Sequence, residues 1–78
     1  MKSKTERVLS IYDRLLEGKV LVKRQEAFRY EVNDRTIQRD LDDIRAHLSE
    51  PENAGLELVY DRKKRGYVIR KTEERKNE

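Results

Sequence analysis

Apolar residues recur at helical spacing in two stretches of the chain. In the first, a capping box at Ser3 and Glu6 precedes one broad stripe, closed by Gly18: Val8, Leu9, Ile11, Tyr12, Leu15 and Leu16. In the second, Asn33 can cap a helix whose narrow stripe has spacings of four, three and four: Ile37, Leu41, Ile44 and Leu48. The pattern therefore predicts one helix between Ser3 and Gly18 and another from Asn33 to about Leu48.

The segment between these two helices has no clear period. Lys19 to Val22 is a short, β-prone piece that would need neighbouring strands to pair with. From Lys23 to Tyr30 the apolar residues spread around more than one face, so periodicity supports a helix only weakly.

Beyond a loop marked by Pro51 and Gly55, the pattern changes to the alternation of strands. Leu56, Leu58 and Tyr60 alternate, then Asp-Arg-Lys-Lys-Arg-Gly follows, and Tyr67 and Ile69 alternate again, which predicts a hairpin over 56–70 with a cationic tip. Tyr60 and Tyr67 fall in the apolar phase, which favours core packing over stacking on bases. Residues 71–78 are almost wholly polar and are expected to form a tail or the start of a linker.

Composition narrows the function classes. The 78 residues suit one domain, with 35% hydrophobic and 45% charged residues. There is no cysteine, and the single histidine, His47, cannot alone build a zinc site or a paired catalytic site, so we expect neither an enzyme nor a cofactor. No apolar run resembles a signal peptide or a membrane span, which makes the cytoplasm the default.

The distribution of charge favours a polyanionic partner. Although the net charge is only +3, residues 1–24 carry +4 and residues 61–71 carry +5, so the remainder is acidic at −6. Two basic zones separated by an acidic middle are typical of electrostatic positioning on nucleic acid. A generally charged, soluble surface is the plain alternative.

Two groups of side chains are candidates for contacting DNA. With the apolar stripe of the 33–48 helix turned inward, the exposed face offers four side chains suited to base edges in a major groove: Arg35, Thr36, Gln38 and Arg39. The hairpin tip offers four cations suited to phosphates: Arg62, Lys63, Lys64 and Arg65. Alternatively, Arg35 and Arg39 pair with Asp42 or Asp43 along the helix, and the tip is merely a solvated turn.

The stretch VNDRTIQRDL at 32–41, continuing DDIR, resembles the recognition-helix signature of DeoR-type and WYL-domain bacterial transcription regulators. VYDRKKRGY at 59–67 resembles the wing of the WYL group, and with RVLSIYDRLLEG at 7–18 the resemblance reaches to about Arg70. It implies a second helix over 23–31 with Ala27 at the helix-helix contact. Glu31 stands where many relatives have glycine, at a cost on the order of 1 kcal/mol if its backbone is left-handed, and Glu26 stands where many have leucine.

We therefore predict an α+β, mainly α, winged helix-turn-helix over 1–70 that binds double-stranded DNA, with the 33–48 helix in the major groove and the 56–70 wing on the backbone. The resemblance implies a cytoplasmic, nucleoid-associated bacterial regulator, a homodimer in its full-length form, with a C-terminal ligand-sensing WYL domain either removed or never present. No small-molecule ligand or membrane contact is expected of this domain. The main rival is a protein-interaction module whose partner meets the first helix and Asp40, Asp42 and Asp43; RNA binding is a weaker one.

Overall fold

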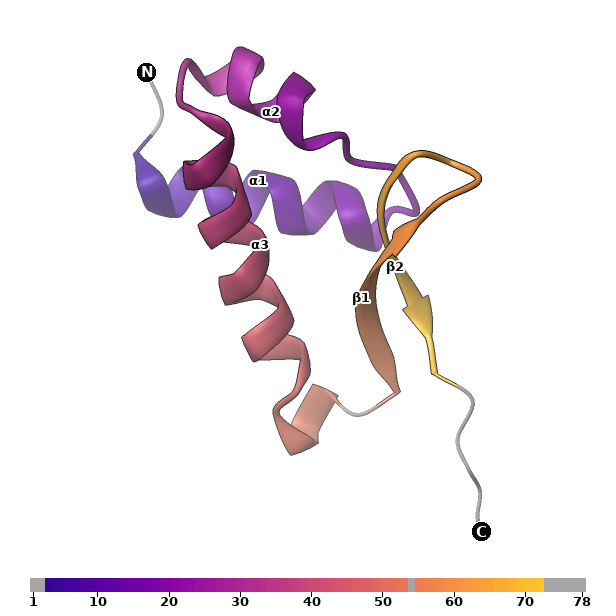
Figure 1. Ribbon diagram of the computed structural model, residues 1–78. Helices are drawn as coiled ribbons and strands as arrows, with labels where there is room; N and C mark the ends of the chain where they lie inside the picture. Colours follow the sequence, from indigo (N-terminus) through magenta and orange to yellow (C-terminus); the bar gives the residue numbers. More distant parts are fainter. Residues whose placement is uncertain (1–2, 54, 73–78) are drawn as a thin grey trace, which may run out of the picture.

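Three helices and a β-hairpin follow one another along the chain (Figure 1). The computed structural model describes residues 3–53 and 55–72. The elements are α1 (Lys4–Leu16), α2 (Lys23–Tyr30), α3 (Asp34–Leu48), a 3-10 turn (Pro51–Asn53), β1 (Leu56–Asp61) and β2 (Gly66–Lys71). This is the predicted α+β winged helix-turn-helix, with α2 and α3 as the helix-turn-helix and the hairpin as the wing. Residues 73–78 of the predicted tail lie outside the described residues.

Local capping chemistry explains where α1 and α3 begin. Ser3 Oγ accepts from the Glu6 amide at 3.1 Å, and Glu6 Oε1 accepts from the Ser3 amide at 3.2 Å, so the predicted capping box is confirmed. Asn33 Oδ1 accepts from the Thr36 amide at 2.8 Å and thereby caps α3. Both helices therefore start where the sequence predicts.

The short helix α2 is less well determined by local capping and apolar spacing than α1 and α3 are. Val22 precedes it and makes no side-chain cap, and of its eight residues only Glu26 and Ala27 are buried. The helix ends at Glu31, whose backbone is left-handed with φ 58° and ψ 45°. The tight turn into α3 thus has the conformation that normally favours glycine, as the departure at Glu31 implied.

Among the described residues, the wing pairs with the segment before α2 at one β-bridge, and it also packs on the helices through the core. β1 and β2 pair antiparallel from Leu56 opposite Lys71 to Asp61 opposite Gly66. Leu21 bridges to Tyr67 with N–H to O distances of 2.9 and 2.7 Å, so the 19–22 piece adds one bridge to the hairpin. A Cβ atom on Gly66 would lie 2.5 Å from Val20 Cγ1 and 2.7 Å from the Leu21 carbonyl oxygen. Only glycine permits this close approach.

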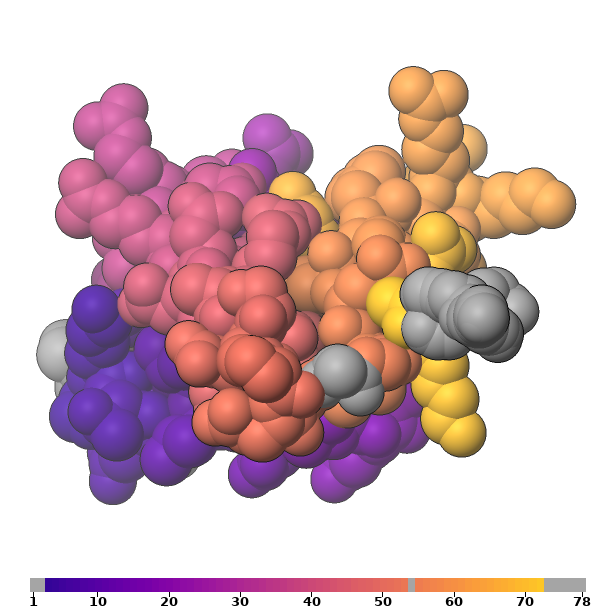
Figure 2. Space-filling model, turned by 90° about the horizontal axis from the view of Figure 1, so that it is seen from below, coloured from indigo at the N-terminus to yellow at the C-terminus, as the bar shows by residue number. Residues whose placement is uncertain are grey.

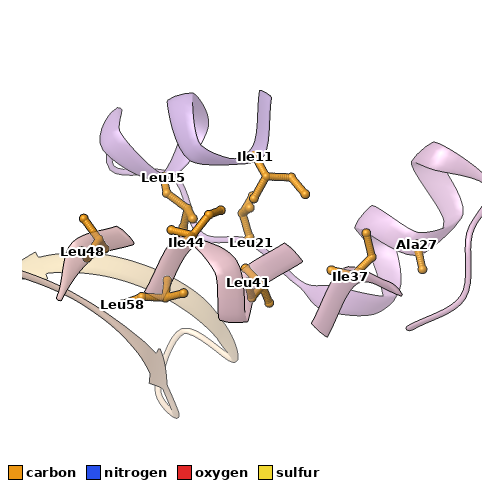
Figure 3. Close-up of a cluster of buried hydrophobic side chains, with 9 residues drawn as sticks. All are labelled: Ile11, Leu15, Leu21, Ala27, Ile37, Leu41, Ile44, Leu48 and Leu58. Atoms are coloured by element: carbon orange, nitrogen blue, oxygen red, sulfur yellow. The ribbon is translucent and has the colours of Figure 1, made fainter. Parts of the chain in front are cut away.

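The core lies where the three helices and the wing meet (Figure 3), and it contains Ile11, Leu15, Leu21, Ala27, Ile37, Leu41, Ile44, Leu48 and Leu58. All four predicted stripe residues of α3 are buried. The stripe of α1 is wider than its buried face, because Leu9 and Leu16 remain about half exposed. The prediction of core packing was wrong for Tyr60, which is 53% exposed, whereas Tyr67 is half-buried and packs against the core.

Two buried ion pairs attach α1 to both other helices. Arg7 donates from Nε and Nη2 to the Asp40 carboxylate at 2.5 and 3.1 Å, and Asp40 is 1% exposed. Arg14 donates to both oxygens of Glu26 at 2.9 and 2.7 Å and to the Tyr30 hydroxyl at 3.0 Å. The carboxylate partners raise the pKa of both arginines, against the opposing effect of burial.

The ion pair with Arg14 explains how Glu26 can be buried at a position where leucine is usual in the regulators that this sequence resembles. Its side chain is only 5% exposed, and the bidentate bond from Arg14 satisfies both carboxylate oxygens inside the α1–α2 contact. None of the helices described is long and apolar enough to span a bilayer.

Candidate nucleic-acid interface

The start of α3 and the tip of the wing protrude from the same side of the molecule. Figure 2 shows long side chains of both segments rising from one face, with a hollow between them, while α1 lies on the opposite side. The two predicted groups of DNA contacts come from these segments, which are well separated in sequence. A single flat or convex surface can therefore touch both groups at once.

Arg35 and Arg39 are exposed on the face of α3 opposite its buried stripe. Neither forms an ion pair within residues 3–53 and 55–72. The alternative prediction, that they pair along the helix with Asp42 or Asp43, is wrong. Asp42 lies 3.4 Å from Arg45 Nη1, and Asp43 lies 3.6 Å from Lys4 Nζ. Both guanidinium groups are thus available to an external acceptor.

Thr36 and Gln38, the other two predicted base contacts, are half-buried and already hydrogen-bonded. Thr36 donates both its amide and its hydroxyl to Asn33 Oδ1, at 2.8 and 3.0 Å. Gln38 Oε1 accepts from Lys23 Nζ at 2.8 Å, and Gln38 Nε2 donates to Asp42 Oδ1 at 2.9 Å. The four predicted base contacts therefore differ. Arg35 and Arg39 form no ion pair among the described residues, Thr36 is part of the helix cap, and Gln38 is hydrogen-bonded at both its amide oxygen and its amide nitrogen.

The wing tip is shaped by Asp61. Its carboxylate accepts from the Lys64 amide at 3.0 Å, and its carbonyl oxygen accepts from the Arg65 amide at 2.8 Å. The hydrogen bond that the Lys64 backbone amide donates to the Asp61 carboxylate is the main reason that the pKa of Asp61 lies below its ordinary value. Arg65 closes the turn with φ 60°, a left-handed backbone that favours glycine. All four cations of the tip, residues 62–65, are exposed.

Lys23 and Tyr60 line one cleft with Asp34 and Arg65, whereas reasoning from the sequence gave Lys23 no role and assigned Tyr60 to the core. Lys23 reaches Gln38 across the α2–α3 contact, a pairing that no spacing within one helix could reveal. Tyr60, on β1 of the wing, packs edge-on against Tyr67 with ring centroids 5.2 Å apart and leaves half of its surface exposed. The alternation of the strand correctly indicated that the two tyrosines share a face, but not that the core ends before Tyr60.

The chemistry on offer is that of hydrogen-bond donors and positive charge. The exposed face combines free guanidinium and ammonium groups, which suit phosphates and the acceptor atoms of guanine. The one histidine, His47, stacks edge-on against Tyr12 at 5.6 Å and borders Asn53 on the α1–α3 side. Within residues 3–53 and 55–72, no three acidic or histidine side chains gather as a metal site.

Compared with protein-family models, curated proteins and solved structures, the chain matches none of them. Its function must therefore be inferred from the face that α3 and the wing form.

Proposed function

We propose that this chain is the DNA-binding domain of a bacterial transcription regulator, with α3 in the major groove and the wing on the adjacent phosphate backbone. The observation that carries the proposal is the shared orientation of two cationic groups, one on α3 and one on the wing tip (Figure 2). A helix of about 10–12 Å diameter fits a groove about 12 Å wide. Arg35 and Arg39 would then reach base edges and nearby phosphates, while residues 62–65 would follow the backbone.

Specific binding by one such module is expected to be weak. A single module of this size buries about 600–1,000 Å² on DNA. Two copies on two half-sites would supply the missing affinity, and this agrees with the homodimer that the family resemblance implies. The resemblance to DeoR-type and WYL-domain regulators, carried by residues 32–41 and 59–67, supports transcription regulation in the bacterial cytoplasm as the setting.

The test is fluorescence anisotropy with a generic duplex at several salt concentrations. Arg35→Ala/Arg39→Ala and Lys63→Ala/Lys64→Ala are each expected to weaken binding and to flatten its salt dependence, by about 0.9 in slope for each phosphate that is no longer neutralised. The matched control is Lys4→Ala/Lys19→Ala, which removes two exposed cations from the start of α1 and the segment after it. An equal weakening in all three variants would mean that only net charge matters.

A protein-interaction module is the second candidate, and one observation favours it. Between α1 and α3 lies an open cleft of about 180 Å³ whose apolar lining includes Val8, Leu9 and Tyr12. The acidic group first suggested for the partner is not assembled, since Asp40 is buried against Arg7. If neither the chain nor a forced dimer binds duplex DNA at roughly 50 mM salt, this second function is the better one.

A further inference from the structure

A cleft of about 240 Å³ lies between the start of α2, the start of α3 and the turn end of the wing. Its volume equals that of roughly eight water molecules at about 30 Å³ each, which is ample for a phosphate group and part of its sugar. The polar and aromatic side chains that line it are Lys23, Arg24, Asp34, Tyr60, Arg65 and Tyr67. The cleft thus shares Arg65 with the wing-tip group that the proposed function uses, and it borders the start of α3 at Asp34.

The side chains that line this cleft carry a net positive charge, which favours binding of an anion. The lining holds three cations against one carboxylate, and none of the three forms an ion pair in the part of the chain that the structure describes. Cations crowded around a small concave space repel one another and focus a positive potential into it. Tyr60 adds a half-exposed ring, held edge-on against Tyr67, that can pack against a sugar. The chemistry fits a sugar-phosphate.

Lys23 connects this cleft to α3. Its ammonium donates to Gln38 Oε1 at 2.8 Å, and Gln38 Nε2 donates to Asp42 Oδ1 at 2.9 Å. To pair with adenine, a glutamine must accept at its oxygen from the N6 amino group and donate from its nitrogen to N7. Both of those atoms are already engaged in the free protein. Each atom can still make a second bond, but the two existing bonds hold the amide in one orientation, so release by Lys23 frees Gln38 to turn toward a base.

We propose that the cleft binds one backbone phosphate of duplex DNA, and that Lys23 exchanges its bond to Gln38 for that phosphate. This inference rests on the proposed function. A phosphate carries a full negative charge whereas the amide oxygen carries only a partial one, so the Lys23 ammonium is attracted more strongly to the phosphate. Once Lys23 is released, both lone pairs of Gln38 Oε1 can accept from a base. Binding of a DNA backbone phosphate in the cleft thus frees Gln38 on α3 to contact a base.

The first experiment compares the salt dependence of duplex binding in wild type and Lys23→Met. The variant is expected to lower the slope by about 0.9, so that raising salt from 50 to 200 mM costs the wild type about threefold more affinity than the variant. Lys19→Met, an exposed lysine close in sequence, is the matched control and should leave the slope unchanged. Lys23→Arg should retain the wild-type slope, and Asp34→Asn should raise affinity by removing the one anion.

The second experiment follows the side-chain amide of Gln38 by NMR during titration with the same duplex. Gln25, the only other glutamine, is exposed on α2 and serves as the internal reference. We expect the Gln38 signal to move on DNA binding, and to differ already in free Lys23→Met. A duplex that binds and is weakened by Arg35→Ala/Arg39→Ala, yet shows no slope change in Lys23→Met, overturns this inference and leaves the proposed function standing. A changed slope with an unmoved Gln38 signal overturns the exchange, and absence of duplex binding even by a forced dimer overturns both.

Discussion

Arg65 combines a strained backbone with a charge that the proposed function needs. Its φ of 60° costs an L-residue roughly 1–2 kcal/mol and costs glycine almost nothing. Glycine has more freedom to lose on folding, which removes about 0.4–1 kcal/mol of that gain. Arg65→Gly is therefore expected to raise the free energy of unfolding by about 0.8 kcal/mol, within a range of about 0–1.6, and the central value raises Tm by about 3–6 °C in a domain of this size.

The same substitution should weaken DNA binding, because it removes one cation from the wing tip. We expect the salt slope of duplex binding to fall by about 0.9 while thermal and urea unfolding show the gain in stability. Lys64→Gly is the matched control: it removes the same charge from the same turn, but Lys64 has no positive φ to relieve. That control should lose about 0.4–1 kcal/mol of stability and show the same fall in slope.

A second control separates strain from charge elsewhere in the chain. Glu31→Gly relieves the other left-handed backbone and should stabilise by a similar amount while leaving all cations in place. If Arg65→Gly unfolds as easily as Lys64→Gly, the wing turn stores no left-handed strain. If Arg65→Gly is more stable but binds duplex with an unchanged slope, the tip does not contact phosphate.

Three further perturbations test the packing and the turn. Gly66→Ala should cost about 1–3 kcal/mol in thermal unfolding, because its Cβ has no room against the segment before α2; an unchanged Tm would contradict the close approach. Asp40→Ala should cost about 3–5 kcal/mol in urea unfolding, because it leaves Arg7 buried without its carboxylate; a loss of stability below about 1 kcal/mol would mean that solvent reaches the guanidinium. Since the pKa of Asp61 is lowered in the fold, its contribution is fully present above about pH 4, its ordinary range, and is lost as pH falls through the lowered value. The Lys64 amide signal in NMR should titrate in that acid range, and should not do so in Asp61→Ala.

The elements that the sequence predicts well are those held by local chemistry. α1 and α3 each carry a cap within three residues of their start, and α3 places its buried residues in one narrow stripe. Such features depend only on neighbours along the chain. The single bridge at Leu21 also follows from its short β-prone context once the hairpin exists.

The helix α2 could not be read from periodicity, because its contacts are ionic and long-range. Glu26 is buried by its bond to Arg14 on α1, while Phe28, the most apolar residue of the helix, is 87% exposed. A prediction that turns Phe28, the most apolar residue, toward the core therefore assigns the wrong face of the helix as buried. The same limit applies to Gln38, whose side chain is held by Lys23 from another helix. Burial and pairing of polar groups depend on partners that only the folded chain brings together.

The bidentate pair of Arg7 and Asp40 constrains the rotation of α3, on which the proposed DNA contacts of Arg35 and Arg39 depend. Apolar contacts along the narrow stripe of α3 are non-directional, so they tolerate a modest turn of the helix about its axis. A bidentate pair is directional, and it holds α3 on the side next to the exposed face. The double variant Arg7→Met/Asp40→Leu is expected to recover most of the stability that Asp40→Ala loses, because it leaves no unpaired buried charge.

The double variant should nevertheless bind duplex DNA more weakly than wild type, since α3 can then rotate and turn Arg35 and Arg39 away from their proposed contacts. The measurement is anisotropy at fixed salt on a variant shown by circular dichroism and urea unfolding to be folded. Its matched control is Leu41→Met, a volume-conserving change in the apolar stripe that leaves the ion pair intact and should cost under about 1.5 kcal/mol. Wild-type affinity in a stable double variant would show that apolar packing alone sets the rotation of α3, and the buried pair would then have no part in presenting the DNA face.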